Sequence, residues 1–557
     1  MSGYLPGAVP WPADLTERWR AAGYWTGQTF ADLLDEQAGR HGNRVAVVEG
    51  ARHTTYRQLR ARARSLAAGL HRLGLRRQDR VVVQLGNVTE FFEVCFALYT
   101  IGAVPVFALP AHRASELDHF IAHSQARAYI VAERIGREDL RPLATLVRNR
   151  SAGPLHVLVA GSVAGHDGLR ELGEHYLPAA DADRCLADAP QPEAAEVAFL
   201  QLSGGSTGLP KLIPRTHDEY LYTLRESARI CGLNADTRYL AVLPVAHNYP
   251  MSSPGCFGVF AVGGRVVLAD GGDPDEAFRV IAAERVTIAA LVPPLALVWA
   301  AAGRRGRDLS SLRVLQVGGA PFPPSAARRL TEAFPDATLQ QVFGMAEGLV
   351  CYTRLDDPLV RIWHSQGRPI SPDDELLVVD DADVPVPPGR PGHLLTRGPY
   401  TIRGYYRAAE HNRTAFTTDG YYRTGDIASV DASGYVQVVG RAKDQINRGG
   451  EKISIEEVEN LLLGHPDVHD AALVAMPDEL LGERSCAFLV PRPGAELNRR
   501  AVTAYLRERG IAAFKIPDRV VIVDAFPETG VGKTSKRELR ALIREQLLAT
   551  TSRSNPS

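Results

Sequence analysis

A loop of small and hydroxylated residues, LSGGSTGLPK, occupies positions 202–211 and ends in a lysine. The apolar run VAFLQL precedes it, so we expect the loop to start where a strand ends. Its glycines permit positive φ and let backbone N–H groups converge on an anion, while its hydroxyls and lysine add donors and charge. This chemistry suits a polyphosphate group. The predicted phosphate-binding residues are Ser203, Gly204, Gly205, Ser206, Thr207, Gly208 and Lys211.

The loop differs from the common P-loop at two positions. Pro210 rather than glycine precedes the lysine, and Leu212 rather than Ser or Thr follows it. A Gly/Ser cluster on its own is more typical of a flexible surface linker. The interpretation as a phosphate-binding loop therefore depends on motifs elsewhere in the chain.

The elements that would position this loop alternate along the N-terminal half. Strand-like apolar runs alternate with amphipathic, Ala/Arg-rich helical stretches at residues 44–50, 56–74, 80–86 and 89–104. That succession predicts an α/β fold with parallel strands. The uncharged stretch 286–303 is interrupted by two prolines, which fits a buried strand followed by a helix better than a membrane span.

The chain changes character after about residue 360. Gly, Pro and short alternating strands there predict a small antiparallel, barrel-like subdomain. The last block, of about 115 residues, is long enough for an α+β domain of its own. We expect a large N-terminal domain of layered sheets and helices over residues 1–440 and a small C-terminal domain over residues 441–557.

The composition narrows the function classes. Among 557 residues, 63 basic side chains nearly balance 64 acidic ones. The composition therefore lacks the excess of positive charge that is typical of proteins that bind nucleic acid or an anionic membrane. The six cysteines show neither a C-x-x-C pair nor zinc-site spacing, so we expect reduced thiols. The first 20 residues lack the pattern of a signal peptide, and we expect a cytoplasmic protein.

Four further motifs give the glycine loop its context. QVFGMAE lies at 341–347, YRTGD at 422–426, GRAKDQ at 440–445 and TGVGK at 529–533. Together with the loop they resemble, in order and spacing, the core motifs of adenylate-forming (ANL) enzymes, the superfamily of acyl-CoA synthetases, luciferases and peptide-synthetase adenylation domains. The segments HNYPMSSPG, FGMAEGLVCYTRLDD and GRAKDQINRGGEK are most similar to stand-alone aryl acid adenylating enzymes of the 2,3-dihydroxybenzoate-AMP ligase type.

The resemblance implies that an aryl carboxylate attacks the α-phosphorus of ATP and that pyrophosphate leaves. Because both reactants are anions, the barrier is mostly charge and positioning. Lys533 would be the main catalytic residue, and Glu347 would act beside it by holding Mg²⁺. Asp426 would bind the ribose hydroxyls. Arg441 would contact ribose or phosphate, or would make a structural ion pair instead. The other predicted ATP-binding residues are Gly318, Gly319, Ala320, Val342, Phe343, Gly344 and Met345.

The same resemblance places the acid pocket. In amino-acid adenylation domains an aspartate binds the substrate amine, whereas here Asn248 occupies that place and can bond a phenolic hydroxyl. The small Ser253 leaves room for a second ring hydroxyl, which favours 2,3-dihydroxybenzoate slightly over salicylate and leaves methylated, amino-substituted and pyridine analogues open. The predicted pocket residues are His247, Asn248, Tyr249, Ser253, Val342 and Val350.

The C-terminal domain is expected to be a mobile lid. The resemblance implies a hinge at Lys443 and a second lid face at Gly449 and Gly450 that completes the thioester-forming site. No carrier motif follows Lys533, so the expected acceptor is a phosphopantetheinylated aryl carrier protein supplied in trans. An aryl-CoA ligase using free CoA is the enzymatic alternative, and an inactive scaffold relative is the non-enzymatic one.

Overall fold

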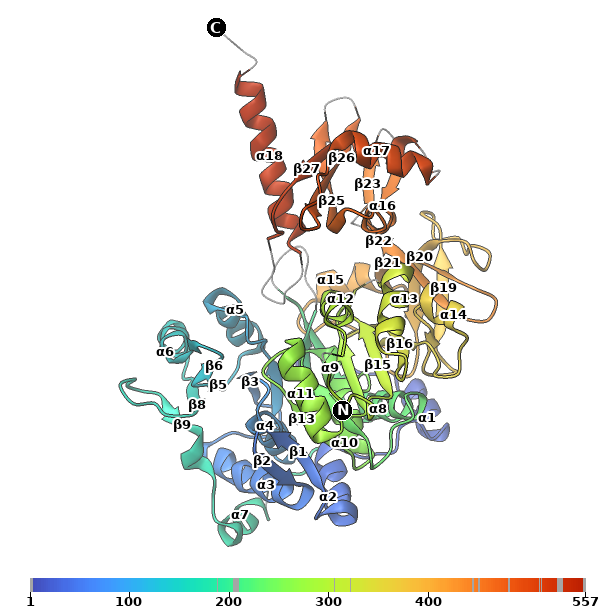
Figure 1. The fold of residues 1–557 in the computed structure, drawn as a ribbon. Coiled ribbons are helices and arrows are strands. Elements are labelled where there is room, and N and C mark those ends of the chain that lie inside the picture. Colours follow the sequence, from blue (N-terminus) through green and yellow to red (C-terminus); the bar gives the residue numbers. More distant parts are fainter. Residues whose placement is uncertain are drawn as a thin grey trace. The chain divides into compact units, whose positions relative to one another are not determined.

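The computed structural model describes residues 4–553 except 188, 204–209, 305, 321, 443–444, 449–450, 479–480, 510, 512 and 528–533. Its contacts divide the chain into two compact units. Unit 1 comprises Met1–Leu376, Leu395–Arg423 and Gly434–Val436, and unit 2 comprises Leu377–Leu394, Thr424–Ser433 and Gln437–Ser557. Figure 1 shows the elements of both units.

Two mixed sheets form the frame of unit 1. The nine-stranded sheet has the order β18-β17-β16-β15-β14-β12-β13-β1-β2, and its six strands from β16 to β1 are parallel. Its strands are β1 (Val45–Glu49), β2 (Arg52–Thr55), β12 (Arg238–Ala241), β13 (Arg265–Leu268), β14 (Ile288–Leu291), β15 (Val314–Gly318), β16 (Thr338–Met345), β17 (Leu349–Tyr352) and β18 (Arg368–Pro369).

The second sheet has seven strands in the order β11-β10-β4-β3-β5-β8-β9. Only the pair β10 and β11, which flanks the glycine loop, is antiparallel. Its strands are β3 (Arg80–Gln84), β4 (Val104–Phe107), β5 (Ala128–Ala132), β8 (His156–Ala160), β9 (Arg170–Glu171), β10 (Val197–Leu202) and β11 (Leu212–Thr216). The predicted α/β architecture with parallel strands is confirmed.

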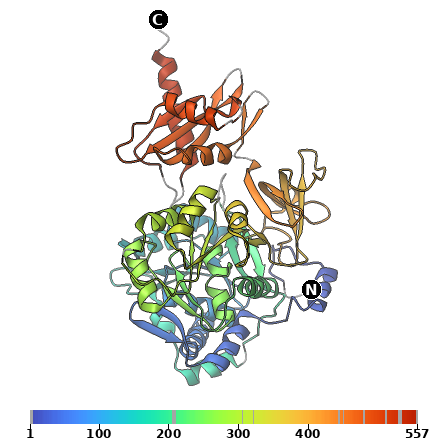
Figure 2. The same ribbon diagram turned by 45° about the vertical axis from the view of Figure 1, so that its right-hand side comes forward.

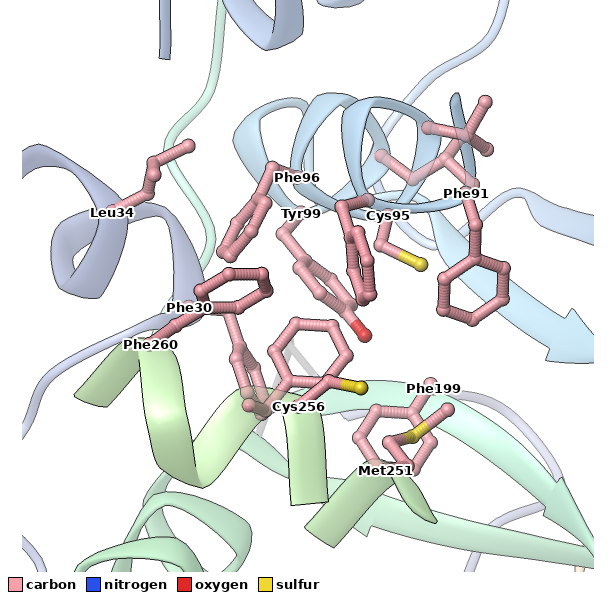
Figure 3. Close-up of a cluster of buried hydrophobic side chains, with 14 of the residues drawn as sticks. Phe30, Leu34, Phe91, Cys95, Phe96, Tyr99, Phe199, Met251, Cys256 and Phe260 are labelled. Atoms are coloured by element: carbon pink, nitrogen blue, oxygen red, sulfur yellow. The ribbon is translucent and has the colours of Figure 1, made fainter. Parts of the chain in front are cut away.

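Helices cover the faces of both sheets and fill the layer between them. The middle layer contains α2 (Phe30–His41), α3 (Tyr56–Leu73), α4 (Thr89–Thr100), α8 (His217–Ile230) and α10 (Gly255–Ala261). Helix α4 is predominantly apolar and almost fully buried, as expected of a helix enclosed by other elements, and its buried Glu93 is paired with Arg52 and Arg62. Figure 3 shows its side chains Phe96 and Tyr99 beside Phe30 and Phe260. The ring centroids of Phe30 and Tyr99 lie 4.7 Å apart.

A different set of helices covers the outer face of each of the two sheets. Helices α5 (Ala114–Ser124) and α6 (Arg141–Arg150) pack on the seven-stranded sheet, and α11 (Pro274–Glu284), α12 (Pro293–Ala302), α13 (Pro324–Ala333) and α14 (Leu359–His364) pack on the nine-stranded one. The shorter elements of unit 1 are α1 (Ala13–Ala21), α7 (Ala179–Leu186), α9 (Asn248–Ser252), α15 (Ala409–Ala415), β6 (Arg134–Ile135) and β7 (Glu138–Asp139).

The uncharged stretch 286–303 forms β14 followed by α12, as predicted. All four residues of β14 are buried, and α12 begins at Pro293, where a missing N–H costs no hydrogen bond. In the part of the chain that the structure describes, none of the helices combines the length with the apolar character that crossing a membrane requires.

A further sheet has the order β19-β20-β21-β22, corresponding to the subdomain predicted after residue 360. Its strands are β19 (Glu375–Val379), β20 (Gly392–Arg397), β21 (Tyr422–Val430) and β22 (Val436–Arg441). The chain then enters the C-terminal α+β part of unit 2, orange to red in Figure 2. The predicted boundary between residues 440 and 441 remains a prediction.

In the described residues, the C-terminal part contains one sheet, three α-helices and a 3-10 turn at Ala513–Lys515. The sheet runs β24-β23-β26-β25, with β27 pairing with β26. Its core includes Ile446, Ile453, Val458 and Leu489, and Arg448 pairs with Asp518 at 2.8 Å. The elements are β23 (Gln445–Arg448), β24 (Glu451–Ser454), β25 (Val468–Asp478), β26 (Gly482–Pro491), β27 (Arg519–Ile522), α16 (Ile455–Leu463), α17 (Arg499–Glu508) and α18 (Lys536–Arg553).

Candidate active site

The two ends of the glycine loop are tied together by main-chain and side-chain hydrogen bonds. The N–H of Ser203 donates to the carbonyl oxygen of Lys211 at 2.9 Å, and the N–H of Lys211 donates to Oγ of Ser203 at 2.9 Å. The loop therefore leaves and re-enters adjacent antiparallel strands, β10 and β11, as the apolar run before it predicted. Lys211 is fixed at the point where the loop closes.

Lys211 and Glu347 both lie next to the side chain of Tyr405. The Nζ of Lys211 lies 5.9 Å from the centroid of the Tyr405 ring, and the phenol of Tyr405 donates to Oε1 of Glu347 at 2.8 Å. Burial, reinforced by the charge of Glu347, raises the pKa of Tyr405 far above its usual value, so this phenol keeps its proton and remains a donor. The structure thus brings together a predicted phosphate ligand and the predicted magnesium ligand. The sequence did not identify Tyr405.

The main chain around Glu347 is held on three sides. The N–H of Ile402 donates to the carbonyl oxygen of Glu347 at 2.9 Å, and Nη1 of Arg215 donates to that of Ala346 at 2.5 Å. Gly348, which follows, has a φ of +115°, and an added Cβ there would lie 2.1 Å from the carbonyl oxygen of Tyr400. Only glycine fits this turn. The turn therefore sets the direction of the Glu347 carboxylate.

Arg215 is a buried charge that the sequence analysis did not assign. It lies on β11, and its Nε and Nη2 donate to the two carboxylate oxygens of Glu219 at 2.8 and 2.6 Å. Both side chains are almost completely buried, at 2% and 1% exposed. The guanidinium carbon also lies 4.7 Å from the ring centroid of Tyr220. An arginine inside the apolar strand LIPRT, with a glutamate four residues later, was the available signal.

The start of α8 explains why Glu219 is available to Arg215. Thr216 precedes the helix, its hydroxyl accepts from the N–H of Glu219, and Glu219 accepts in return from the N–H of Thr216 at 2.8 Å. This capping box fixes the first turn. The same carboxylate caps the helix and neutralises the arginine that supports the Glu347 turn.

The apolar walls of the predicted acid pocket meet at the end of β15. A Cβ added to Gly318 would lie 3.2 Å from Cζ of Tyr249 and 3.0 Å from Cβ of Val342. Gly318 and Val342 are register partners on β15 and β16, and Val350 on β17 pairs with Gly344. The absence of a side chain at Gly318 therefore lets the Tyr249 ring and Val342 pack closely against the end of β15. These predicted pocket and nucleotide-site residues do come together.

Short helix α9 carries the polar residues of the same pocket. His247 precedes it, and Nδ1 of His247 accepts from the N–H of Tyr249 at 3.2 Å. Asn248 is half-buried, and its Oδ1 accepts from the phenol of Tyr220 at 2.8 Å. Ser253 follows α9 and is 4% exposed. All four predicted residues of HNYPMSS thus lie on or next to one helix turn.

Buried hydroxyls gather beside this pocket. Oη of Tyr249 has no hydrogen-bond partner among the described residues. The phenol of Tyr352 lies beside the hydroxyls of Ser227 and Ser253, and burial raises its pKa well above the usual value. Buried polar groups without partners are rare unless water or a ligand satisfies them. This group of hydroxyls could therefore accommodate a polar ring substituent.

The remaining predicted nucleotide residues of unit 1 follow the strand ends. Gly319, with a φ of +82°, and Ala320 are exposed immediately after β15. Phe343 and Met345 are half-buried near the end of β16. Their positions at the carboxyl ends of parallel strands are where ligands bind in α/β sheets.

Asp426 and Arg441, both in unit 2, form an ion pair. The Nε of Arg441 donates to Oδ1 of Asp426 at 2.9 Å, and the Asp426 side chain is 5% exposed. The N–H of Asp426 donates to Oγ1 of Thr424 at 3.0 Å. Arg441 therefore makes the ion pair that the sequence analysis held as the alternative to ribose or phosphate binding, and its partner is the predicted ribose ligand.

Nine of the predicted site residues lie outside the described part of the structure. They are Gly204, Gly205, Ser206, Thr207, Gly208, Lys443, Gly449, Gly450 and Lys533. Their roles remain predictions.

Known proteins resemble this chain over nearly its whole length. Profiles described as AMP-binding enzyme and AMP-binding enzyme C-terminal domain match residues 34–406 and 457–533. A 2,3-dihydroxybenzoate-AMP ligase of Bacillus subtilis (strain 168) is 56% identical, covering 98% of this chain and 99% of the relative. A salicylyl-CoA synthase / salicylate adenylyltransferase of a Streptomyces species is 48% identical, covering 97% and 98%.

Solved structures agree with these sequence matches. The apo structure of Mycobacterium smegmatis MbtA is 42% identical, with a TM-score of 0.71, and the match covers 96% of this chain and 99% of that one. An anthranilate CoA ligase, AuaEII, shares the fold with a TM-score of 0.83 at 24% identity, over 94% and 98% of the two chains. With a glycine loop, a glutamate turn and a C-terminal domain in the predicted order, this chain belongs to the AMP-binding enzyme family.

Proposed function

We propose that this enzyme activates an aryl carboxylic acid of the 2,3-dihydroxybenzoate or salicylate type with ATP and then transfers the acyl group to a thiol. The first product is the acyl adenylate. The acceptor is the phosphopantetheine thiol of an aryl carrier protein, in siderophore or other nonribosomal peptide biosynthesis. Relatives named as 2,3-dihydroxybenzoate-AMP ligases, including the vibriobactin-specific enzyme of Vibrio cholerae at 50% identity, support this function.

The observation that carries the proposal is the character of the acid pocket. Tyr249 and Val342 pack against Gly318 and supply an aromatic and an aliphatic wall, and the polar side chain at the start of α9 is the neutral Asn248 rather than a carboxylate. A carboxylate there would favour a protonated amine. A neutral amide favours an acid whose substituents are uncharged.

Different residues of this chain bind the phosphates, neutralise charge and orient the ribose during adenylate formation. A carboxylate oxygen of the acid forms a bond to the α-phosphorus while the bond to pyrophosphate breaks, so negative charge builds up on the phosphates. Ser203, Lys211 and the rest of their loop bind the departing phosphates. Lys533 neutralises charge between the acid and the α-phosphate, and Asp426 orients the ribose through its hydroxyls. Arg441 holds Asp426 for that contact.

The residues around Glu347 fit a magnesium ion. The described residues contain no group of three or more acidic, histidine or cysteine side chains that could enclose a metal, and the carboxylate beside Tyr405 is that of Glu347. Magnesium is typically held by one or two carboxylates together with substrate phosphates and water. Glu347, 8% exposed and oriented by Tyr405, matches that need. When bound, the ion would neutralise phosphate charge as it develops.

The second half-reaction requires a different face of the C-terminal domain. In our proposal Lys443 is the hinge, and Gly449 and Gly450 line the thioester-forming site after rotation. The reaction takes place in the cytoplasm, where ATP and carrier proteins are found together. A relative named as a salicylyl-CoA synthase favours free CoA as the second candidate acceptor.

The test is aryl acid-dependent exchange of labelled pyrophosphate into ATP. We expect exchange with 2,3-dihydroxybenzoate and salicylate and background rates with fatty acids or amino acids. Lys533→Ala should lower exchange at least about a hundredfold, because the lysine acts mainly in the transition state. Lys515→Ala, which removes a lysine paired with Glu457 at 2.6 Å in the same unit, should leave exchange within about twofold. Equal exchange with decanoate or phenylalanine would contradict the function.

Loading assays then separate the two acceptors. The purified enzyme receives salicylate, ATP and either a phosphopantetheinylated aryl carrier protein or free CoA. We expect acylation of the carrier to exceed acylation of CoA at equal concentrations. Preferential formation of salicylyl-CoA would make the enzyme an aryl-CoA ligase instead.

A further inference from the structure

The amide of Asn248 is held in one orientation by a neighbouring helix. Tyr220, on α8, places its phenol oxygen 2.8 Å from Oδ1 of Asn248. Tyr220 is fully buried, with its ring edge-on to Phe199 at 4.6 Å between centroids and the Arg215 guanidinium 4.7 Å from the ring centroid. The phenol is therefore fixed by packing on both sides and cannot turn away from the amide.

The polarity of this hydrogen bond follows from the chemistry of a buried phenol. Burial raises the pKa of Tyr220 well above its usual value, so the group stays protonated. Its single proton needs an acceptor, and Oδ1 of Asn248 supplies one at 2.8 Å. The Ser252 hydroxyl also lies beside this phenol, and it donates its own proton to the main-chain carbonyl oxygen of Asn248 at 3.0 Å. The carbonyl side of the amide is thus engaged. The Nδ2 group has no acceptor among the described residues and is the side available to a ligand.

We propose that Tyr220 is a positioning residue that makes Asn248 a hydrogen-bond donor toward the ortho substituent of the acid, so that the pocket selects an ortho acceptor and rejects an ortho donor. The proposal rests on the function above, with Asn248 in the acid pocket. It adds the direction of the hydrogen bond between Asn248 and the acid. An asparagine alone leaves this direction open, because its amide can present either its N–H donors or its carbonyl acceptor.

Salicylate and anthranilate are nearly equal in size and show whether Asn248 donates a hydrogen bond to the ortho substituent or accepts one from it. In salicylate the phenolic proton bonds to the molecule's own carboxylate, so a lone pair of the ortho oxygen points outward and can accept from Nδ2. In anthranilate one amino hydrogen bonds to the carboxylate and the second points outward, where it meets the Nδ2 hydrogens. Two opposed donors in a buried site leave both unsatisfied, which costs far more than losing one contact.

The experiment compares kcat/KM for salicylate and anthranilate in pyrophosphate exchange by the full-length enzyme. We expect wild type to favour salicylate by about a hundredfold. Tyr220→Phe frees the amide to rotate, so this preference should fall about tenfold, mainly through loss of salicylate activity. Tyr222→Phe is the matched control: it removes a buried phenol bonded to Oγ of Ser371 at 2.7 Å from the same helix, and the preference should not change.

A double-variant cycle shows whether Tyr220 acts through Asn248. In an Asn248→Ala background, Tyr220→Phe should leave the salicylate-to-anthranilate ratio unchanged, because the amide that it orients is gone. Thermal unfolding of each variant checks that the protein is folded. An unchanged ratio in folded Tyr220→Phe, or an equal effect in both backgrounds, would overturn the proposal. If no aryl acid supports exchange by wild type, the proposed function itself fails, which is a separate outcome.

Discussion

The phenol of Tyr405 donates a 2.8 Å hydrogen bond to Oε1 of Glu347, although 58 positions separate the two residues. Tyr422 extends the contact, since its phenol oxygen lies 2.9 Å from that of Tyr405. With the ammonium of Lys211 near the same ring, three segments of unit 1 meet at Tyr405, whose phenol holds the Glu347 carboxylate. A carboxylate fixed in this way is pre-organised for a metal and phosphates.

The first prediction concerns Tyr405→Phe, which removes this hydrogen bond and keeps the ring. We expect kcat for pyrophosphate exchange to fall about tenfold and the magnesium concentration for half-maximal rate to rise, because outer contacts of a metal ligand are typically worth 10–100-fold. The measurement is exchange over a magnesium titration. Tyr406→Phe is the control, since its buried phenol has no partner among the described residues. An unchanged magnesium dependence in Tyr405→Phe would contradict the assignment of Glu347.

The second prediction concerns the buried pair of Arg215 and Glu219. Arg215→Met leaves the Glu219 carboxylate buried and unpaired, so we expect the free energy of unfolding to fall by about 3–5 kcal/mol. Urea unfolding measures this loss. Adding Glu219→Leu should recover much of it, since a buried pair replaced by apolar groups is often nearly neutral. Exchange activity should stay low in the double variant, because the Ala346 carbonyl has lost its donor. A double variant as unstable as Arg215→Met would argue against an unpaired charge as the cause.

The third prediction concerns the hydroxyl of Ser253 and the buried hydroxyls beside it. Ser253→Ala removes a polar group that lies beside the buried phenol of Tyr352. If a second ring hydroxyl binds there, kcat/KM for 2,3-dihydroxybenzoate should fall about tenfold while that for salicylate changes less than about twofold. Parallel exchange assays with the two acids give the ratio. Equal losses with both acids would place the 3-hydroxyl elsewhere.

The fourth prediction concerns pH and Asp374, whose Oδ2 accepts from the phenol of Tyr400 at 2.6 Å. Burial raises the pKa of Asp374 from 3.8 to about 8. Between these two values the folded protein keeps a proton that the unfolded chain has lost, so this group makes the free energy of unfolding fall as pH rises from about 4 to about 8. Asp374→Asn cannot ionise. Its urea midpoint should therefore rise relative to wild type across that window.

Urea titrations of both proteins at pH 5, 6.5 and 8 test this sign. Asp373→Asn is a suitable control, because the neighbouring Asp373 is half-buried and pairs with Arg18 at 2.8 Å. A constant difference between Asp374→Asn and wild type over the three pH values would show that the carboxyl ionises normally in the folded protein.

Local patterns predicted the elements and the residues at strand ends, but not the contacts that join distant segments. Ser203, Lys211 and Glu347 sit in motifs whose composition indicates phosphate chemistry. Nothing local distinguishes Tyr405 from Tyr406, because only the fold turns one toward Glu347 and packs the other in an apolar core. Long-range geometry decides such pairs.

The same limit applies to the acid pocket. The sequence indicated Asn248 as a neutral residue where an aspartate would bind an amine, but not which end of its amide meets the ligand. That depends on Tyr220, whose contact with Asn248 comes from the packing of α8 against α9. Arg215 was a missed signal of another kind, because a charge inside an apolar strand already requires a buried partner.

The central claim is that this chain makes an aryl adenylate, and the most direct measurement is detection of that product. Excess enzyme is mixed with ATP, magnesium and 2,3-dihydroxybenzoate in the absence of any thiol, quenched in acid and analysed by mass spectrometry. We predict a dihydroxybenzoyl-AMP species in near-stoichiometric yield with the limiting acid, together with pyrophosphate, and no corresponding adenylate from decanoate or phenylalanine. Release of ADP and phosphate without an acyl adenylate, or equal adenylate yields from all three acids, would contradict the account.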